Sequence, residues 1–216
     1  MPDPVTDLMP EFARPASLAE ALRLLDRGGW RVLAGGTDLY PGAGSRLSGA
    51  VLDLTGVAGL AGIAQAGDVR IGAATSWAAI AGAGLPPALQ ALKAAARAVG
   101  GRQVQVAGTI GGNLCNASPA ADGVPPLLVL EAEVELRSLA GVRRLRLEDF
   151  LLGPRRTALH PGEVMVAVVV PQAALAGRSA FVKLGARSHL VISIAMGGSY
   201  QQNFPVYRDS LLSSSV

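Results

Sequence analysis

Two short glycine-containing segments, residues 32–39 and 109–113, carry groups suited to binding an anion. Each pairs adjacent glycines with a threonine, and the second ends in Asn113. Glycine lets the backbone approach a ligand closely, and successive N–H groups can then converge on an anion. The hydroxyl and carboxamide add donors for phosphate oxygens. One Gly-Gly pair also marks an ordinary loop, but two such segments predict an extended diphosphate held from both sides, as in a dinucleotide.

Neither segment matches the common nucleotide-binding motifs. The sequence has no G-x-x-x-x-G-K-[ST], which argues against a P-loop. Gly28-Gly29 and Gly35-Gly36 do not make G-x-G-x-x-G, and loop-forming residues follow at 40–50 in place of a long crossover helix. A nicotinamide-binding Rossmann unit is therefore not expected.

The length and apolar content bound the class of protein. The 216 residues suffice for one large domain or two small ones. Half of them are hydrophobic, but no run reaches the roughly eighteen apolar residues that span a bilayer. Residues 1–15 contain acidic residues and several prolines, so we expect no signal peptide and a cytoplasmic location.

Charged and reactive residues exclude several functions. The net charge is +3, but the basic residues are scattered and aromatics are only 4%, so a nucleic-acid surface is not expected. Cys115 is the one cysteine and there are two histidines. This chain alone therefore offers no disulfide, cysteine-ligated iron–sulfur cluster or evident metal site, and we predict no catalytic residue. Cys115 is interpreted as a small buried side chain.

Apolar periodicity and turn residues predict an α+β fold. Ser17 and Glu20 form a capping box for a helix that ends at Gly28-Gly29. Further helices are expected over 86–99, from Thr75 to about 81, and after Pro125. Strands or hairpins are expected at 31–33, 51–54, 62–72, 103–106, 132–147, 163–170, 181–186 and 190–195. After Met196 the sequence becomes polar and rich in serine, so 197–216 is expected to be loose or foreign to the fold.

Several of these motifs occur together in one known family. They include P-A-S-L-A-E-A at 15–21, A-G-G-T-D-L at 34–39, T-I-G-G-N-L at 109–114, N-A-S-P-A-A-D at 116–122, P-G-E at 161–163 and F-V-K-L-G-A-R at 181–187. Over residues 10–195 the chain resembles the FAD-binding, or medium, subunit of bacterial molybdenum hydroxylases. That group includes xanthine dehydrogenases, aerobic carbon monoxide dehydrogenases and 4-hydroxybenzoyl-CoA reductases.

The resemblance implies a para-cresol methylhydroxylase-type FAD-binding domain with two α+β subdomains, at about 1–58 and 59–176. Residues 177–196 would be the start of the C-terminal domain that covers the flavin. Relatives continue about ninety residues beyond Lys183, so the resemblance implies a C-terminal truncation. Relatives also have Arg-Asn where this chain has Gln105-Val106.

The resemblance also implies roles for individual residues. Residues 32–39 and 109–113 would hold the pyrophosphate and ribityl regions through backbone N–H groups, with Thr37, Thr109 and Asn113 adding donors and Leu39 near the isoalloxazine. Asp122 would accept a hydrogen bond from a ligand hydroxyl, or else cap the helix near Pro125. Lys183 would lie near the flavin. The implied cofactor contacts are Val32, Leu33, Ala34, Gly35, Gly36, Thr37, Asp38, Leu39, Val99, Thr109, Ile110, Gly111, Gly112, Asn113, Asp122, Met165 and Lys183.

The function implied by this resemblance is electron transfer. A molybdenum-cofactor large subunit would oxidise a small substrate, and a two-iron two-sulfur small subunit would pass electrons to this subunit's FAD and on to NAD or a quinone. Two alternatives remain open. One is a self-contained flavin oxidase or reductase, and the other is a truncated docking subunit without catalysis.

Overall fold

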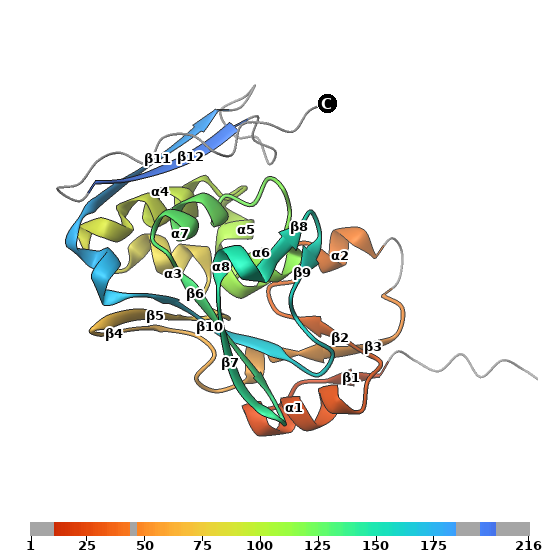
Figure 1. Ribbon diagram of the computed structural model, residues 1–216. Coiled ribbons are helices and arrows are strands. Elements are labelled where there is room, and N and C mark those ends of the chain that lie inside the picture. The colour runs from red at the N-terminus through yellow and green to blue at the C-terminus, as the bar shows by residue number, and fades with distance from the viewer. Residues whose placement is uncertain (1–10, 44–46, 185–194, 202–216) are drawn as a thin grey trace, which may run out of the picture.

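The computed structural model describes residues 11–43, 47–184 and 195–201. Helices and strands are both abundant, and the fold is α+β as expected from the sequence (Figure 1). Two units follow one another along the chain, each built around its own sheet.

The first unit is a three-stranded parallel sheet with a helix beside it. Helix α1 (Leu18–Asp26) begins at Ser17, whose hydroxyl accepts a hydrogen bond from the Glu20 N–H, so the predicted Ser17 cap is confirmed. The Glu20 carboxylate accepts from the Ala16 N–H in place of the Ser17 N–H that a capping box uses. The other elements are β1 (Phe12–Ala13), β2 (Trp30–Leu33), α2 (Leu39–Gly42), β3 (Ala50–Asp53) and a 3-10 turn at Leu54–Gly56, with the strands in the order β1-β3-β2.

The second unit contains a five-stranded antiparallel sheet. Its order is β4 (Ile63–Ala66), β5 (Asp68–Gly72), β10 (Val164–Val170), β6 (Glu133–Ser138) and β7 (Gly141–Arg146). All seven residues of β10 are buried. Val168 and Val170 belong to the core beneath the helices, and Val164 and Val166 belong to the core that contains α1. An unbroken valine-rich run is suited to a strand buried on both faces.

Helices cover one face of this sheet, and α1 lies below the other (Figure 1). They are α3 (Trp77–Gly82), α4 (Gln90–Ala98) after a 3-10 turn at Pro87–Leu89, α5 (Arg102–Ala107), α6 (Ile110–Asn116), α7 (Val124–Val129) and α8 (Leu147–Phe150). Trp77 and Phe150 are among the largest fully buried side chains. This core fixes α6, which carries the second glycine segment.

The remaining strands form two small ribbons. Strands β8 (Leu151–Gly153) and β9 (Arg156–Thr157) pair with each other. After a 3-10 turn at Gln172–Ala176, β11 (Arg178–Leu184) pairs with β12 (Ala195–Gln201). The expectation of a loose segment after Met196 is therefore wrong up to residue 201, because pairing with β11 forms a strand there despite the weak sequence pattern. The rest of that segment, and most of the strand expected at 190–195, lie outside the described residues. The assignment of 1–58, 59–176, 177–196 and 197–216 to separate domains stays a prediction.

Two other local expectations are wrong. Residues 103–106 form part of α5 and not a strand: Gln105 N–H donates to the Gly101 carbonyl and Gly108 N–H to the Val104 carbonyl. A four-residue alternation cannot distinguish a strand from one helical turn. The helix after Thr75 is capped by Ser76, because the Thr75 hydroxyl instead bonds to the Gly62 backbone.

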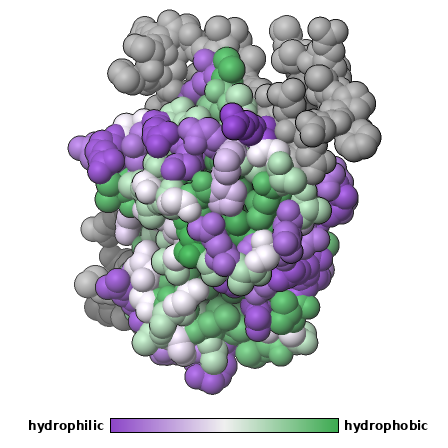
Figure 2. All heavy atoms as spheres, turned by 90° about the vertical axis from the view of Figure 1, so that its left-hand side faces the viewer, coloured by the Kyte–Doolittle hydropathy of each residue, from purple (hydrophilic) through white to green (hydrophobic). Residues whose placement is uncertain are grey.

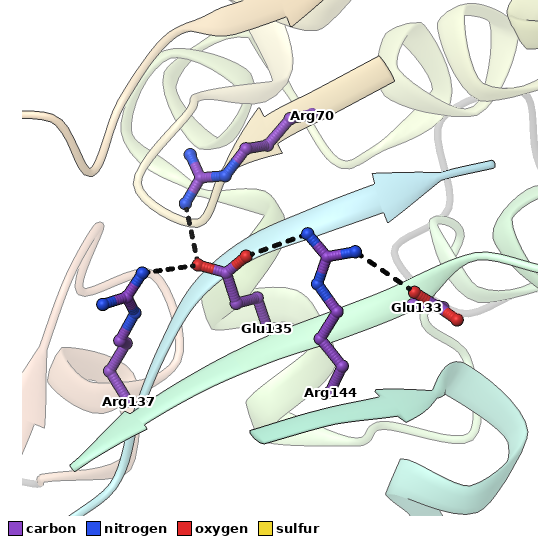
Figure 3. Close-up of polar contacts among 5 residues, drawn as sticks. All are labelled: Arg70, Glu133, Glu135, Arg137 and Arg144. Carbon is purple, nitrogen blue, oxygen red and sulfur yellow. Dashed lines mark hydrogen bonds and ion pairs between the residues drawn. The ribbon is translucent and has the colours of Figure 1, made fainter. Parts of the chain in front are cut away.

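One buried carboxylate organises a charged cluster on the sheet. Glu135 on β6 accepts Arg70 and Arg137 at one oxygen (3.3 and 3.4 Å) and Arg144 at the other (3.2 Å), and Arg144 also reaches Glu133 (Figure 3). Burial alone would raise the pKa of Glu135, but hydrogen bonds from Arg144 and the charge of Arg70 hold it below its usual value.

The side of the molecule in Figure 2 shows hydrophilic and hydrophobic residues in several separate groups.

This cluster gives a pH-dependent contribution to stability. Because the pKa of Glu135 is lower in the folded chain than in the unfolded one, the contribution is complete above the ordinary value of 4.5 and is lost as the pH falls through the folded-state value. We expect urea unfolding of the Glu135→Gln variant to depend less on pH between 6 and 3 than unfolding of the parent chain. An identical pH dependence would show that the cluster contributes nothing.

Candidate functional site

A cavity of about 900 Å³ lies where the first unit meets α5, α6 and the start of β10. Its lining includes both glycine segments. Of the seventeen residues that the sequence assigns to cofactor binding, these fifteen line it: Val32, Leu33, Ala34, Gly35, Gly36, Thr37, Asp38, Leu39, Val99, Thr109, Gly111, Gly112, Asn113, Asp122 and Met165. Its volume lies within the usual range of ligand-binding cavities.

The first glycine segment offers unengaged donors. Within the described part of the chain, no hydrogen bond uses the N–H groups of residues 35–39. Gly36 has φ +69°, in the left-handed region that favours glycine. A Cβ on Gly35 would lie 1.9 Å from the Ala107 carbonyl oxygen, so glycine there lets this segment pack against the end of α5. The segment can therefore present several N–H groups to an anion in the cavity.

The second glycine segment is the first turn of α6, not a separate turn. The hydroxyl of its N-cap, Thr109, accepts a hydrogen bond from Gly112 N–H at 3.0 Å. Ile110 and Gly111 donate to the Thr75 and Ala73 carbonyls, and Asn113 donates to the Thr109 carbonyl. The expectation that successive N–H groups of this segment face the ligand therefore fails for 110–113, because α6 and the neighbouring loop already use them. Any ligand contact of this segment would therefore come from side chains such as those of Thr109 and Asn113.

Asn113 is one such side chain. Its Oδ1 is buried and has no hydrogen-bond partner within the described residues. A buried amide oxygen without a partner carries an energetic cost of about 1–3 kcal/mol, and a ligand hydroxyl or amine in the cavity would remove that cost. The arrangement fits a polar ligand.

Two of the expected residues lie outside the cavity lining. Ile110 is fully buried in the core beneath α6. Lys183 lies behind Asp122: its ammonium group is 2.8 Å from Asp122 Oδ2 and donates to the Ala98 carbonyl at 3.1 Å. Helix α7 is capped by Gly123 without a side-chain bond, so Asp122 does not act as its cap. Lys183 therefore contacts a residue of the cavity lining, Asp122, but does not line the cavity itself.

Sequence reasoning missed several lining residues. Trp77, Asn116, Arg155 and Glu163 contact the cavity but were not assigned to it. Asn116 stands in the N-A-S-P-A-A-D motif and Glu163 in P-G-E, so both had a sequence signal. Arg155 had none, since its place depends on the β8–β9 ribbon folding back toward α6.

Glu163 is held at the start of β10 by a bidentate partner. Arg143 Nε and Nη2 donate to its two oxygens at 3.0 and 2.7 Å, and His160 N–H donates at 2.8 Å. Burial would raise the pKa of Glu163, but the Arg143 and His160 hydrogen bonds lower it. Glu163 therefore stays ionised, which argues for a bracing role and against proton transfer near neutral pH.

Cys115 lines the cavity with its side chain partly buried, not fully buried as expected, and it is a poor nucleophile. Burial raises the pKa of its thiol to about 12, so the reactive thiolate is scarce at neutral pH. We expect Cys115→Ala to retain FAD and to lose about 1 kcal/mol of stability, and we expect the parent thiol to resist iodoacetamide at pH 8. Loss of flavin reduction with FAD still bound would contradict this.

The two α+β units with a cavity at their junction define a para-cresol methylhydroxylase-type FAD-binding domain. Residues 8–173 match the family model described as the FAD binding domain in molybdopterin dehydrogenase, and the chain belongs to this family. Its cofactor is FAD.

Individual relatives agree with this assignment. The nicotinate dehydrogenase FAD-subunit of Eubacterium barkeri is 36% identical over 200 residues, which are 87% of this chain and 67% of that subunit. The xanthine dehydrogenase FAD-binding subunit of Escherichia coli O157:H7 is 35% identical, covering 74% of this chain and 57% of that subunit. The chain thus spans between about half and two thirds of the length of these relatives.

The fold is also similar to that of a solved structure. A chain of carbon monoxide dehydrogenase from Hydrogenophaga pseudoflava, in a form that lacks the Mo-pyranopterin moiety, superposes with a TM-score of 0.78 at 30% identity, covering 88% of this chain and 68% of that one.

Among the described residues, no helix is long and apolar enough to cross a membrane, and no group of three or more histidine, cysteine or acidic residues could hold a metal ion.

Proposed function

We propose that this chain is an electron-transferring FAD subunit of a molybdenum hydroxylase. The observation that carries the proposal is the cavity bounded by the unengaged N–H groups of residues 35–39 on one side and by the side chains of α6 on the other. A dinucleotide has an extended diphosphate and sugar hydroxyls, and this lining has separate groups for each.

The residues divide the work of binding. The N–H groups of 35–39 and the Thr37 hydroxyl would hold the diphosphate. Asn113 Oδ1 and Asp122 are acceptors suited to ligand hydroxyls, and Leu39, Val99 and Met165 offer apolar surface for rings. Lys183 neutralises Asp122 from behind, so the cavity wall gains an acceptor without a large unbalanced charge.

When bound, FAD supplies the redox chemistry, since it can take up two electrons and release them singly or together. The chain's own residues bind and orient the cofactor and exclude water from it. Glu163 stays ionised and Cys115 stays protonated near neutral pH, so neither is suited to exchange a proton with an organic substrate. The substrate chemistry would therefore belong to a partner subunit.

The partners proposed are a molybdenum-cofactor large subunit and a two-iron two-sulfur small subunit, with NAD or a quinone as acceptor. Support comes from relatives that carry the names FAD-subunit and medium chain, which denote components of larger enzymes. Cys115 alone cannot ligate an iron–sulfur cluster, so electrons must come from outside this chain.

Reconstitution tests this role. The FAD-loaded chain should be reduced by dithionite yet show no turnover with purines or aldehydes. Added to molybdenum and iron–sulfur subunits of such an enzyme, it should restore substrate-dependent reduction of an acceptor. Steady turnover by the chain without partners would contradict the relay role and favour a self-contained oxidase.

A further inference from the structure

A chain of polar contacts links the two units beside the cavity. Asn116 Nδ2, at the end of α6, donates to Asp38 Oδ1 at 2.7 Å, and Asp38 belongs to the first glycine segment. Arg155, between β8 and β9, donates to Asn116 Oδ1 and lies 3.5 Å from the Asn116 carbonyl oxygen. All three residues line the cavity. We call this set, Asp38, Asn116 and Arg155, the polar bridge.

The polar bridge is directional. The Asp38 carboxylate can only accept hydrogen bonds and the Arg155 guanidinium can only donate them. The amide of Asn116 satisfies both in one orientation alone, with its nitrogen toward Asp38 and its oxygen toward Arg155. A residue with two acceptor oxygens at this position would keep the Arg155 contact and lose the one to Asp38.

The backbone around the polar bridge is held in an unusual conformation. Ala117 and Arg155 have φ of +44° and +57°, in the left-handed region that non-glycine residues rarely adopt. Their backbones are joined, since Arg155 N–H donates to the Ala117 carbonyl at 2.8 Å. Such conformations persist where surrounding contacts enforce them, and they concentrate at binding sites. The β8–β9 ribbon is thus fixed to the end of α6.

The polar bridge is also placed to control the cavity. Among the described residues, Asn116–Asp38 is the one long-range hydrogen bond between residues 11–58 and 59–184. Helix α2, which begins beside Asp38, lies on the same side of the molecule as the β8–β9 ribbon (Figure 1). Separation of the first glycine segment from α6 would open the cavity at this point.

We propose that the polar bridge is a positioning device that holds the first glycine segment over the bound cofactor and limits the rate at which FAD leaves. The proposal rests on the proposed function, because it takes FAD as the ligand of this cavity. Asp38, Asn116 and Arg155 act by fixing the segment whose N–H groups meet the diphosphate.

The test measures FAD release from the loaded chain after dilution into an excess of another apoprotein that binds FAD tightly and so captures the free cofactor. Asn116→Asp should release FAD about three- to tenfold faster, which corresponds to about 0.7–1.4 kcal/mol, the size of one lost hydrogen bond. The exchange Asn116→Asp with Asp38→Asn restores a donor facing an acceptor and should return release toward the parent rate. Arg146→Met, which removes an exposed ion pair between Arg146 on β7 and Glu148 on α8, is the control.

Two results would overturn the role proposed for the polar bridge. Release from Asn116→Asp at the parent rate, or an exchange variant as fast as the single one, would overturn the proposal. If Asn116→Asp does not fold, Arg155→Ala replaces it, and unchanged release from that variant would be equally contrary. A parent chain that is folded but never binds FAD would instead contradict the proposed function, so the two failures are distinguishable.

Discussion

Replacing Gly36 by valine is expected to abolish FAD retention. Gly36 has φ +69°, a conformation that valine rarely adopts, and a Cβ there would also collide with the Tyr40 ring, so the backbone that presents the N–H groups of 35–39 would be strained. The flavin absorbance of the purified variant, relative to protein, measures the loss.

The matched control is Gly28→Val. Gly28 has φ +75°, so the two substitutions carry a similar backbone strain of about 1–2 kcal/mol. A Cβ on Gly28 would meet nothing within 4 Å, and Gly28 does not line the cavity. Equal flavin content in both variants would mean that the first glycine segment does not hold the cofactor.

Replacing Lys183 by methionine is expected to cost about 3 kcal/mol of the free energy of unfolding. Lys183 and Asp122 form an ion pair at 2.8 Å with 16% and 5% of their side chains exposed, so the substitution removes a cation in direct contact with a buried carboxylate. The double variant Lys183→Met with Asp122→Asn removes both charges and should recover most of the loss. Urea unfolding of the three chains gives the comparison.

Arg146→Met controls for the loss of any surface cation. Arg146 pairs with Glu148, but their side chains are 52% and 58% exposed, and such pairs contribute little. A Lys183→Met variant as stable as Arg146→Met would show that the Asp122 charge is solvated without Lys183.

The sequence predicted the elements with strong local signals. The Ser17 cap, the hairpin at 62–72, the valine-rich strand ending before Pro171 and the helix ending near Val99 all occur as expected. In each case the pattern is long or has a specific terminator, so local preference and tertiary packing agree.

The glycine segments were recognised, but not how each one works. Their similar composition suggested two similar anion-binding turns. The N–H groups of residues 110–113, however, already donate hydrogen bonds to Thr109 and to the loop at Ala73–Thr75. Whether a Gly-Gly pair opens a helix or forms a loop depends on carbonyls distant in sequence. The same reason hid Arg155, whose place comes from a ribbon that folds back onto α6.

Lys183 illustrates a further limit. The F-V-K-L-G-A-R motif located this lysine near the site, but its partner, Asp122, is sixty-one residues away in sequence. Only the packing of β11 against α4 and α7 brings the two together. A motif can therefore identify a residue without revealing which side chain it contacts.

Titration of the cofactor-free chain with FAD tests the central claim most directly. We expect flavin fluorescence and visible absorbance to saturate at one FAD per chain, with much weaker binding of FMN, because FMN lacks the diphosphate that residues 35–39 would hold. A chain that circular dichroism shows to be folded but that binds neither flavin, or binds both equally, would contradict a cavity built around a dinucleotide.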